Sequence, residues 1–190
     1  MRSPRPRLEA EVIRDSILRA SGLLSMKQGG PGVYPPQPVG VTEVAYGSPT
    51  WTASTGDDRL RRSLYTFRKR TAPFAMYQTF DAPSGEYCTA RREASNTPLQ
   101  ALTLLNDPMF MEAYEALGEL IAKRGETDAE RIDFACERIL CRRPTDEERD
   151  TLMTLATAER DRSNEAPSRG EASFDANEKN IAAWARVARA

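Results

Sequence analysis

The sequence predicts a mainly α fold: an irregular helical bundle of about six to seven helices with a long extended arm rich in proline and glycine. Three observations predict this class. Several segments open with a helix-capping residue, their apolar residues recur with the 3.6-residue period of a helix, and no segment shows the sustained alternation typical of a half-buried strand. Because 190 residues with 39% hydrophobic content can form one core, we expect a single domain over residues 1–190.

The first predicted helix lies within residues 8–24, where four apolar residues recur at spacings of four, three and four: Ile13, Ile17, Ala20 and Leu24. Prolines and glycines then crowd residues 28–56, which excludes a helix or a central strand. We expect an extended arm there, with one short strand near residues 41–46.

A second helix is predicted after the arm, capped by Asp57 or Asp58 and ending before Pro73. Its apolar side carries Leu60, Leu64 and Phe67. Residues 73–96 contain several turn-forming residues, so we expect an irregular connection.

The later helix starts are more explicit. Thr97 precedes a proline and has a glutamine three residues on, Asp107 also precedes a proline, and Thr127 and Thr145 each open a capping box with a glutamate. The two capping boxes predict an antiparallel helical hairpin. The helix after Asp107 should end at Gly125 and carries a stripe of Phe110, Tyr114, Leu117 and Ile121.

The last part of the chain predicts a flexible connection at residues 163–174, followed by a helix that begins at 175–178. This helix shows Ile181, Trp184, Ala185 and Ala188 on one side. We expect its apolar surface to stay exposed.

Composition excludes several function classes. The chain has no histidine, so it lacks the Ser-His-Asp and Cys-His machinery, histidine-ligated zinc and a histidine base. With 27 basic and 28 acidic residues the net charge is -1, which makes nucleic acid an unfavoured partner. The three cysteines lack the CxxCH spacing, so we expect no covalent haem, and neither a metal nor another cofactor is predicted. No stretch is apolar enough to span a membrane, and acidic residues interrupt the N-terminal segment where an export signal would need an apolar run.

One cluster of polar residues surrounds the helix start at Thr97. Free backbone N–H groups and the helix dipole favour an anion at such a point. The cluster is therefore either an anion-binding site or a structural clamp whose carboxylates come from Asp81, Glu86 or Glu93, and we favour the clamp. Its members are Arg91, Arg92, Asn96, Thr97 and Gln100.

Two other chemistries stay open. The same three acidic residues could supply the paired carboxylates of a polysaccharide-directed hydrolase, the main acid/base route left without histidine. The basic run in residues 59–70, interleaved with Tyr65 and Phe67, could instead meet phosphates of a nucleic acid. We assign no catalytic residue.

Several motifs along the chain form a recognisable set. They are Arg61–Phe67, Thr79–Pro83, Cys88–Thr89, Arg91–Arg92 and Asn96–Pro108, with Arg142–Thr145 further on. Together these motifs resemble one bacterial family, the Planctomycete domain of unknown function fifteen fifty-three. The resemblance covers almost the whole chain, and its central run is long enough to be specific.

The resemblance implies a C-terminal domain of large exported proteins that often begin with a cytochrome c-like domain and a second domain of unknown function. It implies no reaction. On this basis we expect a fragment of a longer periplasmic or cell-envelope protein, in which the chain is a non-catalytic interaction module that packs against the N-terminal domains of its parent protein.

Overall fold

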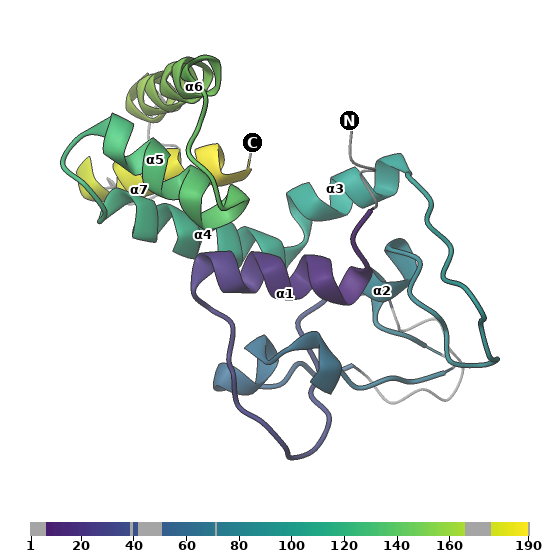
Figure 1. Cartoon of the computed structure of the whole chain (residues 1–190). Helices are drawn as coiled ribbons and strands as arrows, with labels where there is room; N and C mark the ends of the chain where they lie inside the picture. Colours follow the sequence, from purple (N-terminus) through teal and green to yellow (C-terminus); the bar gives the residue numbers. More distant parts are fainter. Residues whose placement is uncertain (1–6, 39, 42–50, 71, 166–175, 190) are drawn as a thin grey trace. The chain divides into compact units, whose positions relative to one another are not determined.

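The computed structural model describes residues 7–38, 40–41, 51–70, 72–165 and 176–189. Within these ranges it contains seven α-helices and two short 3-10 helices, with isolated bridges in place of strands, which confirms the mainly α class (Figure 1). The α-helices are α1 (Ala10–Ser21), α2 (Ala75–Thr79), α3 (Pro98–Asn106), α4 (Pro108–Ala122), α5 (Asp128–Leu140), α6 (Asp146–Glu165) and α7 (Ala176–Arg189).

The chain divides into two compact units. Unit 1 comprises Met1–Arg19 and Leu23–Met111, and unit 2 comprises Ala20–Gly22 and Glu112–Ala190. This division into units does not test the prediction of a single domain over residues 1–190, which stays a prediction. Most of the predicted flexible connection at 163–174 lies outside the described residues, but α6 continues to Glu165, so the start of that segment is helical.

Helix α1 buries a different row of residues from the one its sequence predicts. Ala10, Arg14 and Leu18 are buried, at spacings of four, whereas Ile13 and Ile17 are only half-buried. The helix ends at Gly22, whose φ of 81° is left-handed, and the Leu24 N–H donates to the Leu18 carbonyl. The buried face is shifted because it contains a charged side chain with partners that only the tertiary structure supplies.

Arg14 is fully buried, and its guanidinium donates mostly to backbone. Its NH1 donates to the Arg61 carbonyl at 2.7 Å, and its NH2 donates to the Arg59 carbonyl at 2.9 Å. Its Nε lies 3.2 Å from the sulfur of Met109. Burial lowers the pKa of Arg14, the direction expected for a cation removed from water. One side chain therefore ties α1 to the 59–63 segment and to the start of α4.

These contacts explain why the helix predicted between Asp57 and Pro73 is wrong. The segment forms two 3-10 helices, Gly56–Leu60 and Ser63–Tyr65, with extended backbone at Arg61 between them. Leu64 is 75% exposed and so does not join an apolar helix face. A continuous α-helix would direct the Arg59 and Arg61 carbonyls into its own ladder, whereas here Arg14 binds both.

The described part of the arm, residues 28–38, 40–41 and 51–55, contains neither helix nor strand, and most of the predicted strand at 41–46 lies outside the described residues. Parallel bridges join Ser25 to Arg61 and Val33 to Thr66. A further correction concerns residues 73–96, where a short helix, α2, interrupts the expected irregular connection. Its residues Met76 and Tyr77 are buried, together with Phe74 and Phe80 on either side.

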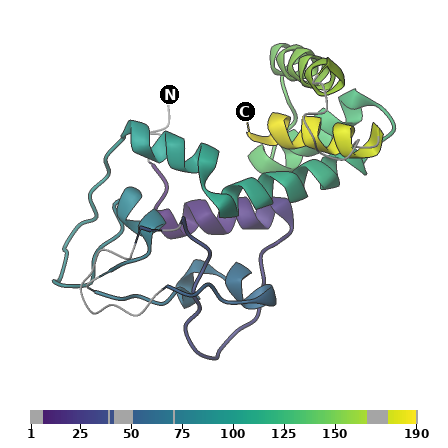
Figure 2. The ribbon, with the colours of Figure 1, turned by 180° about the vertical axis from the view of Figure 1, so that it is seen from behind.

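Unit 2 is built on α5, α6, α7 and most of α4, which the two opposite views show together (Figures 1 and 2). The capping boxes at Thr127 and Thr145 form as predicted. The predicted exposure of α7 is wrong: Trp184 is fully buried and Ile181 is half-buried. The core is Leu117, Ile121, Ile132, Ala135, Cys136, Ala156, Trp184 and Val187.

Polar contacts reinforce this core. Glu159 of α6, itself buried, pairs with Arg186 of α7 at 3.0 Å. Asp128 at the start of α5 forms two hydrogen bonds with Arg160 of α6, at 2.6 and 2.7 Å. Gly118 allows the closest approach, because a Cβ at this position would lie 2.5 Å from the Ala185 nitrogen. The backbones of α4 and α7 therefore meet at a point where only glycine fits.

We predict that Arg14→Met destabilises the protein by about 3 kcal/mol, because the variant leaves the buried Arg61 carbonyl and the partly buried Arg59 carbonyl without the donors that Arg14 supplies. Chemical denaturation followed by far-UV circular dichroism measures the loss. Arg19→Met, at an exposed position of the same helix, is the matched control and should change stability by less than about 1 kcal/mol. Equal effects of the two substitutions would contradict the assigned role of Arg14.

We predict that Gly118→Ala lowers the free energy of unfolding by about 1 to 3 kcal/mol, since the added methyl group overpacks the contact between α4 and α7. Thermal unfolding is the measurement. Glu115→Ala on the exposed side of α4 serves as control, and an unchanged midpoint for Gly118→Ala would show that the two helices are not in close contact.

Candidate functional site

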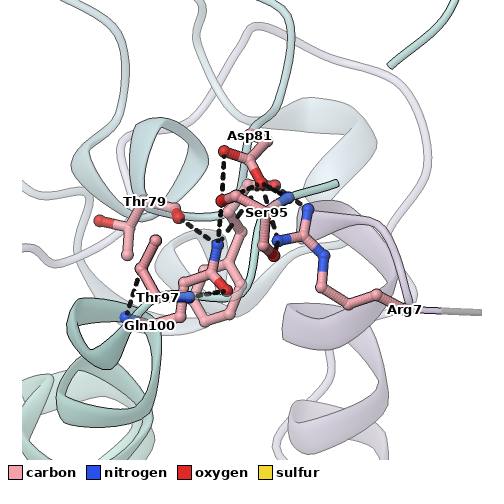
Figure 3. A network of polar contacts seen from close by, with 7 residues as sticks. Arg7, Thr79, Asp81, Ser95, Thr97 and Gln100 are labelled. Atoms are coloured by element: carbon pink, nitrogen blue, oxygen red, sulfur yellow. Dashed lines mark hydrogen bonds and ion pairs between the residues drawn. The ribbon is translucent and has the colours of Figure 1, made fainter. Parts of the chain in front are cut away.

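Asp81 is the centre of a polar network that we call the Asp81 clamp, formed by Arg7, Thr79, Asp81, Ser95 and Gln100 (Figure 3). Asp81 follows the end of α2 with a φ of 56°, a left-handed conformation that Asp tolerates better than most residues. Its carboxylate accepts from the Ser95 backbone N–H at 2.8 Å and from the Ser95 hydroxyl, and it pairs with Arg7 at 2.7 Å.

Gln100 connects the clamp to α3. Its side-chain amide donates to the Thr79 carbonyl at 2.9 Å and to the Ser95 hydroxyl at 3.1 Å. The same side chain accepts from the Thr97 N–H, and the Thr97 hydroxyl accepts from the Gln100 N–H, which is the capping box expected from the sequence. Gln100 thus caps α3 and attaches it to the end of α2.

Arg7 closes the clamp from the segment before α1. Its guanidinium donates to the Phe80 carbonyl at 3.2 Å and also to the Ser95 carbonyl. Three segments that are distant in sequence therefore meet around one carboxylate. Hydrogen bonds from the Ser95 backbone, and with them the Ser95 hydroxyl and the Arg7 charge, outweigh the effect of burial and hold the pKa of Asp81 below its ordinary value.

Arg92 belongs to a second ion-pair group, centred on Glu11 of α1. It donates to Glu11 at 2.7 Å, and Arg68 donates to the other Glu11 oxygen at 2.8 Å. Burial acts to raise the pKa of Glu11, but the hydrogen bond from Arg92 and the two guanidinium charges outweigh it, so the pKa lies below its usual value. The expected partners of Arg92 were therefore wrong: its carboxylates are Glu11 and, at 3.3 Å, Glu9.

The structure separates the predicted site residues into three groups. Thr97 and Gln100 belong to the Asp81 clamp and the cap, Arg92 joins the Glu11 group, and Arg91 and Asn96 have exposed side chains. Glu86 and Glu93 are also exposed. Sequence reasoning missed Arg7 and Ser95, because neither stands in a recognisable pattern and each reaches Asp81 only through the fold.

Helix α3 has an inverted distribution of polarity. Its fully buried residue is the polar Gln100, at 4% exposure, whereas Leu99 is 60%, Leu102 54% and Leu105 37% exposed. A surface helix ordinarily buries its apolar residues and exposes its polar ones. We call these three leucines the α3 leucine face. Because the clamp and cap secure Gln100, the leucines are directed away from the interior of unit 1.

The Asp81 clamp does not have the electrostatics of a general acid. A general acid needs a raised pKa, whereas Asp81 has a lowered one and is engaged by Arg7 and Ser95. Within the described ranges, no three Cys, Asp or Glu side chains gather closely enough to hold a metal ion.

Two further findings concern the cysteines and the membrane. The three cysteines, all within the described ranges, are free thiols. No described helix has both the length and the apolar character needed to cross a bilayer.

The described residues form a mainly helical fold with a polar cluster, the Asp81 clamp, and an exposed leucine face on α3. The comparisons then give its family: residues 1–156 match the model described as Protein of unknown function (DUF1553), and the chain belongs to this family. This confirms the resemblance seen in the sequence. No curated protein and no solved structure gives a significant match.

We predict that Asp81 makes stability depend on acid. Its folded-state pKa lies below the ordinary value of 3.8, so its contribution is present above that pH and is lost as the pH falls through the folded-state pKa. Asp81→Asn keeps an acceptor for Ser95 and a residue tolerant of the left-handed backbone, but it has no charge to lose.

The measurement is the free energy of unfolding between pH 6 and pH 2.5. Wild type should be more stable than Asp81→Asn near neutrality, by less than about 1 kcal/mol because the pair is partly exposed, and the difference should shrink below pH about 4. Parallel curves for the two proteins would contradict the lowered pKa.

Proposed function

We propose that this chain is a non-catalytic helical module that binds another protein domain through the α3 leucine face. In this proposal it acts within a cell-envelope, cytochrome-associated protein of the kind that the family resemblance implies, and its partners are the N-terminal domains of the parent protein. The observation that carries the proposal is the inverted polarity of α3. A leucine face of this kind marks an interaction surface when neighbouring elements hold it outward.

The contacts of the charged residues support a module without catalysis. Arg92, the central arginine of the predicted anion site, is paired with Glu11, and Asp81 is paired with Arg7. The hydrolase alternative is weakened, because Asp81, one of its three candidate carboxylates, is engaged in this ion pair. The nucleic-acid alternative is weakened as well, because Arg61 of the basic run is buried and Arg68 is paired with Glu11.

We predict that Leu99→Ser/Leu102→Ser separates the module from its partner and leaves its fold intact. Substitutions at exposed positions change stability little, whereas each leucine that anchors an interface contributes about 1 to 2 kcal/mol to binding. The measurement is the native size at which the tagged 190-residue chain elutes after mixing with the N-terminal domains of the parent protein, made as a separate polypeptide.

Wild type should elute with its partner, and the double variant should elute at the size of the free chain. Leu64→Ser, at a leucine that is 75% exposed but lies outside α3, is the matched control and should elute like wild type. If wild type and the double variant both elute as the free chain, the proposed function is wrong.

A further inference from the structure

The chemistry of the α3 leucine face restricts what can cover it, an inference that rests on the proposed function. None of the nine residues of α3 is charged. Its polar side chains also turn back on the helix: the Thr103 hydroxyl donates to the Leu99 carbonyl at 2.9 Å, and the Asn106 amide donates to the Leu102 carbonyl at 3.0 Å. The exposed side therefore presents leucine side chains, and these two groups already have partners within the helix.

The spacing of the leucines selects a mode of contact. Leu99, Leu102 and Leu105 follow one another at intervals of three, which places them within an arc of about 120° on a helix that turns 100° per residue. Gln100 lies on the opposite side of the helix. Anchors at such intervals are typical of a helix that lies in an apolar groove of its partner.

Charge complementarity excludes a strongly charged cover. A charged partner side chain buried against α3 would lose its water and find no opposite charge on this helix, a costly arrangement. A lipid surface is also a poor fit, because helices that lie on membranes carry Lys or Arg on their polar side and α3 has neither. A second copy would bring only another short leucine face, whereas stable dimers bury about 800 Å² on each partner.

We infer that α3 docks into an uncharged, apolar groove of a different protein domain, with Leu99, Leu102 and Leu105 as its anchors. Nine helical residues span about 13 Å, which sets the length of the groove. Thr97 and Asp107 mark its two ends, since the cap begins α3 at the first and Asp107 is buried at the second.

The test places a photoreactive diazirine amino acid at position 102 of the full chain, in cells that make the protein, with position 64 as the matched exposed control. Irradiation and mass spectrometry then identify the residues joined to each position. We expect at least about tenfold more cross-linking from position 102, to a segment of the N-terminal domains of the parent protein, outside residues 1–190, whose joined residues are apolar and uncharged. Adding Leu99→Ser should lower that yield about tenfold, the effect of losing one anchor worth about 1.4 kcal/mol.

Each other result overturns the inference in a distinct way. Cross-links to residues 98–106 of the same chain would identify a second copy, and cross-links to lipid would identify a membrane. Cross-links to charged residues of the parent protein's N-terminal domains would refute the apolar groove but leave the proposed function standing. Equal or absent cross-linking at positions 102 and 64 would refute both.

Discussion

The buried guanidinium of Arg14 is the interaction on which unit 1 depends. Among the described residues before Pro98, α1 is the longest helix, and many of the others lie outside regular secondary structure. A loop-rich unit has few ladder hydrogen bonds of its own, so its carbonyls need donors from elsewhere. Arg14 supplies such donors to the carbonyls of Arg59 and Arg61, and its Nε contacts the sulfur of Met109.

Arg61 binds backbone carbonyls in the same way. Its buried guanidinium donates to the carbonyls of Gly29 and Pro31, and it lies 3.9 Å from the ring centre of Tyr65. Two arginines thus supply side-chain donors to backbone carbonyls of unit 1.

Polar contacts also determine the orientation of the helix on which the proposed function rests. Surface helices usually take their orientation from the burial of an apolar stripe. Helix α3 takes its orientation instead from Gln100, which the Asp81 clamp and the capping box hold in place. This arrangement leaves Leu99, Leu102 and Leu105 exposed. The clamp therefore positions α3 through its contacts with Gln100.

Much of the helical framework was predictable because it depends on local chemistry. The caps at Thr97, Thr127 and Thr145 form hydrogen bonds within one turn, so a few neighbouring residues specify each of them. The predictions failed where the deciding partner is distant in sequence. The helix expected at 57–72 gave way to contacts with Arg14, and the partner of Arg92 lies 81 residues earlier. The candidate site was accordingly half predicted: Thr97 and Gln100 are local, whereas Arg7 and Ser95 join Asp81 only in the folded chain.

The sequence by itself determined the helical class, the principal helix starts and the family. Each of these depends on residues that are close together in the sequence: capping residues, the helical period of apolar residues, and one long motif. Only the tertiary structure decided which side of each helix faces inward. In α1 it buried an arginine because two carbonyls from a distant segment compensate for the lost hydration. In α3 it buried a glutamine and exposed the leucines because the amide has partners in Thr79 and Ser95. Hydrophobic periodicity cannot anticipate such outcomes, since a polar side chain becomes a good core residue only when the fold brings it hydrogen-bond partners.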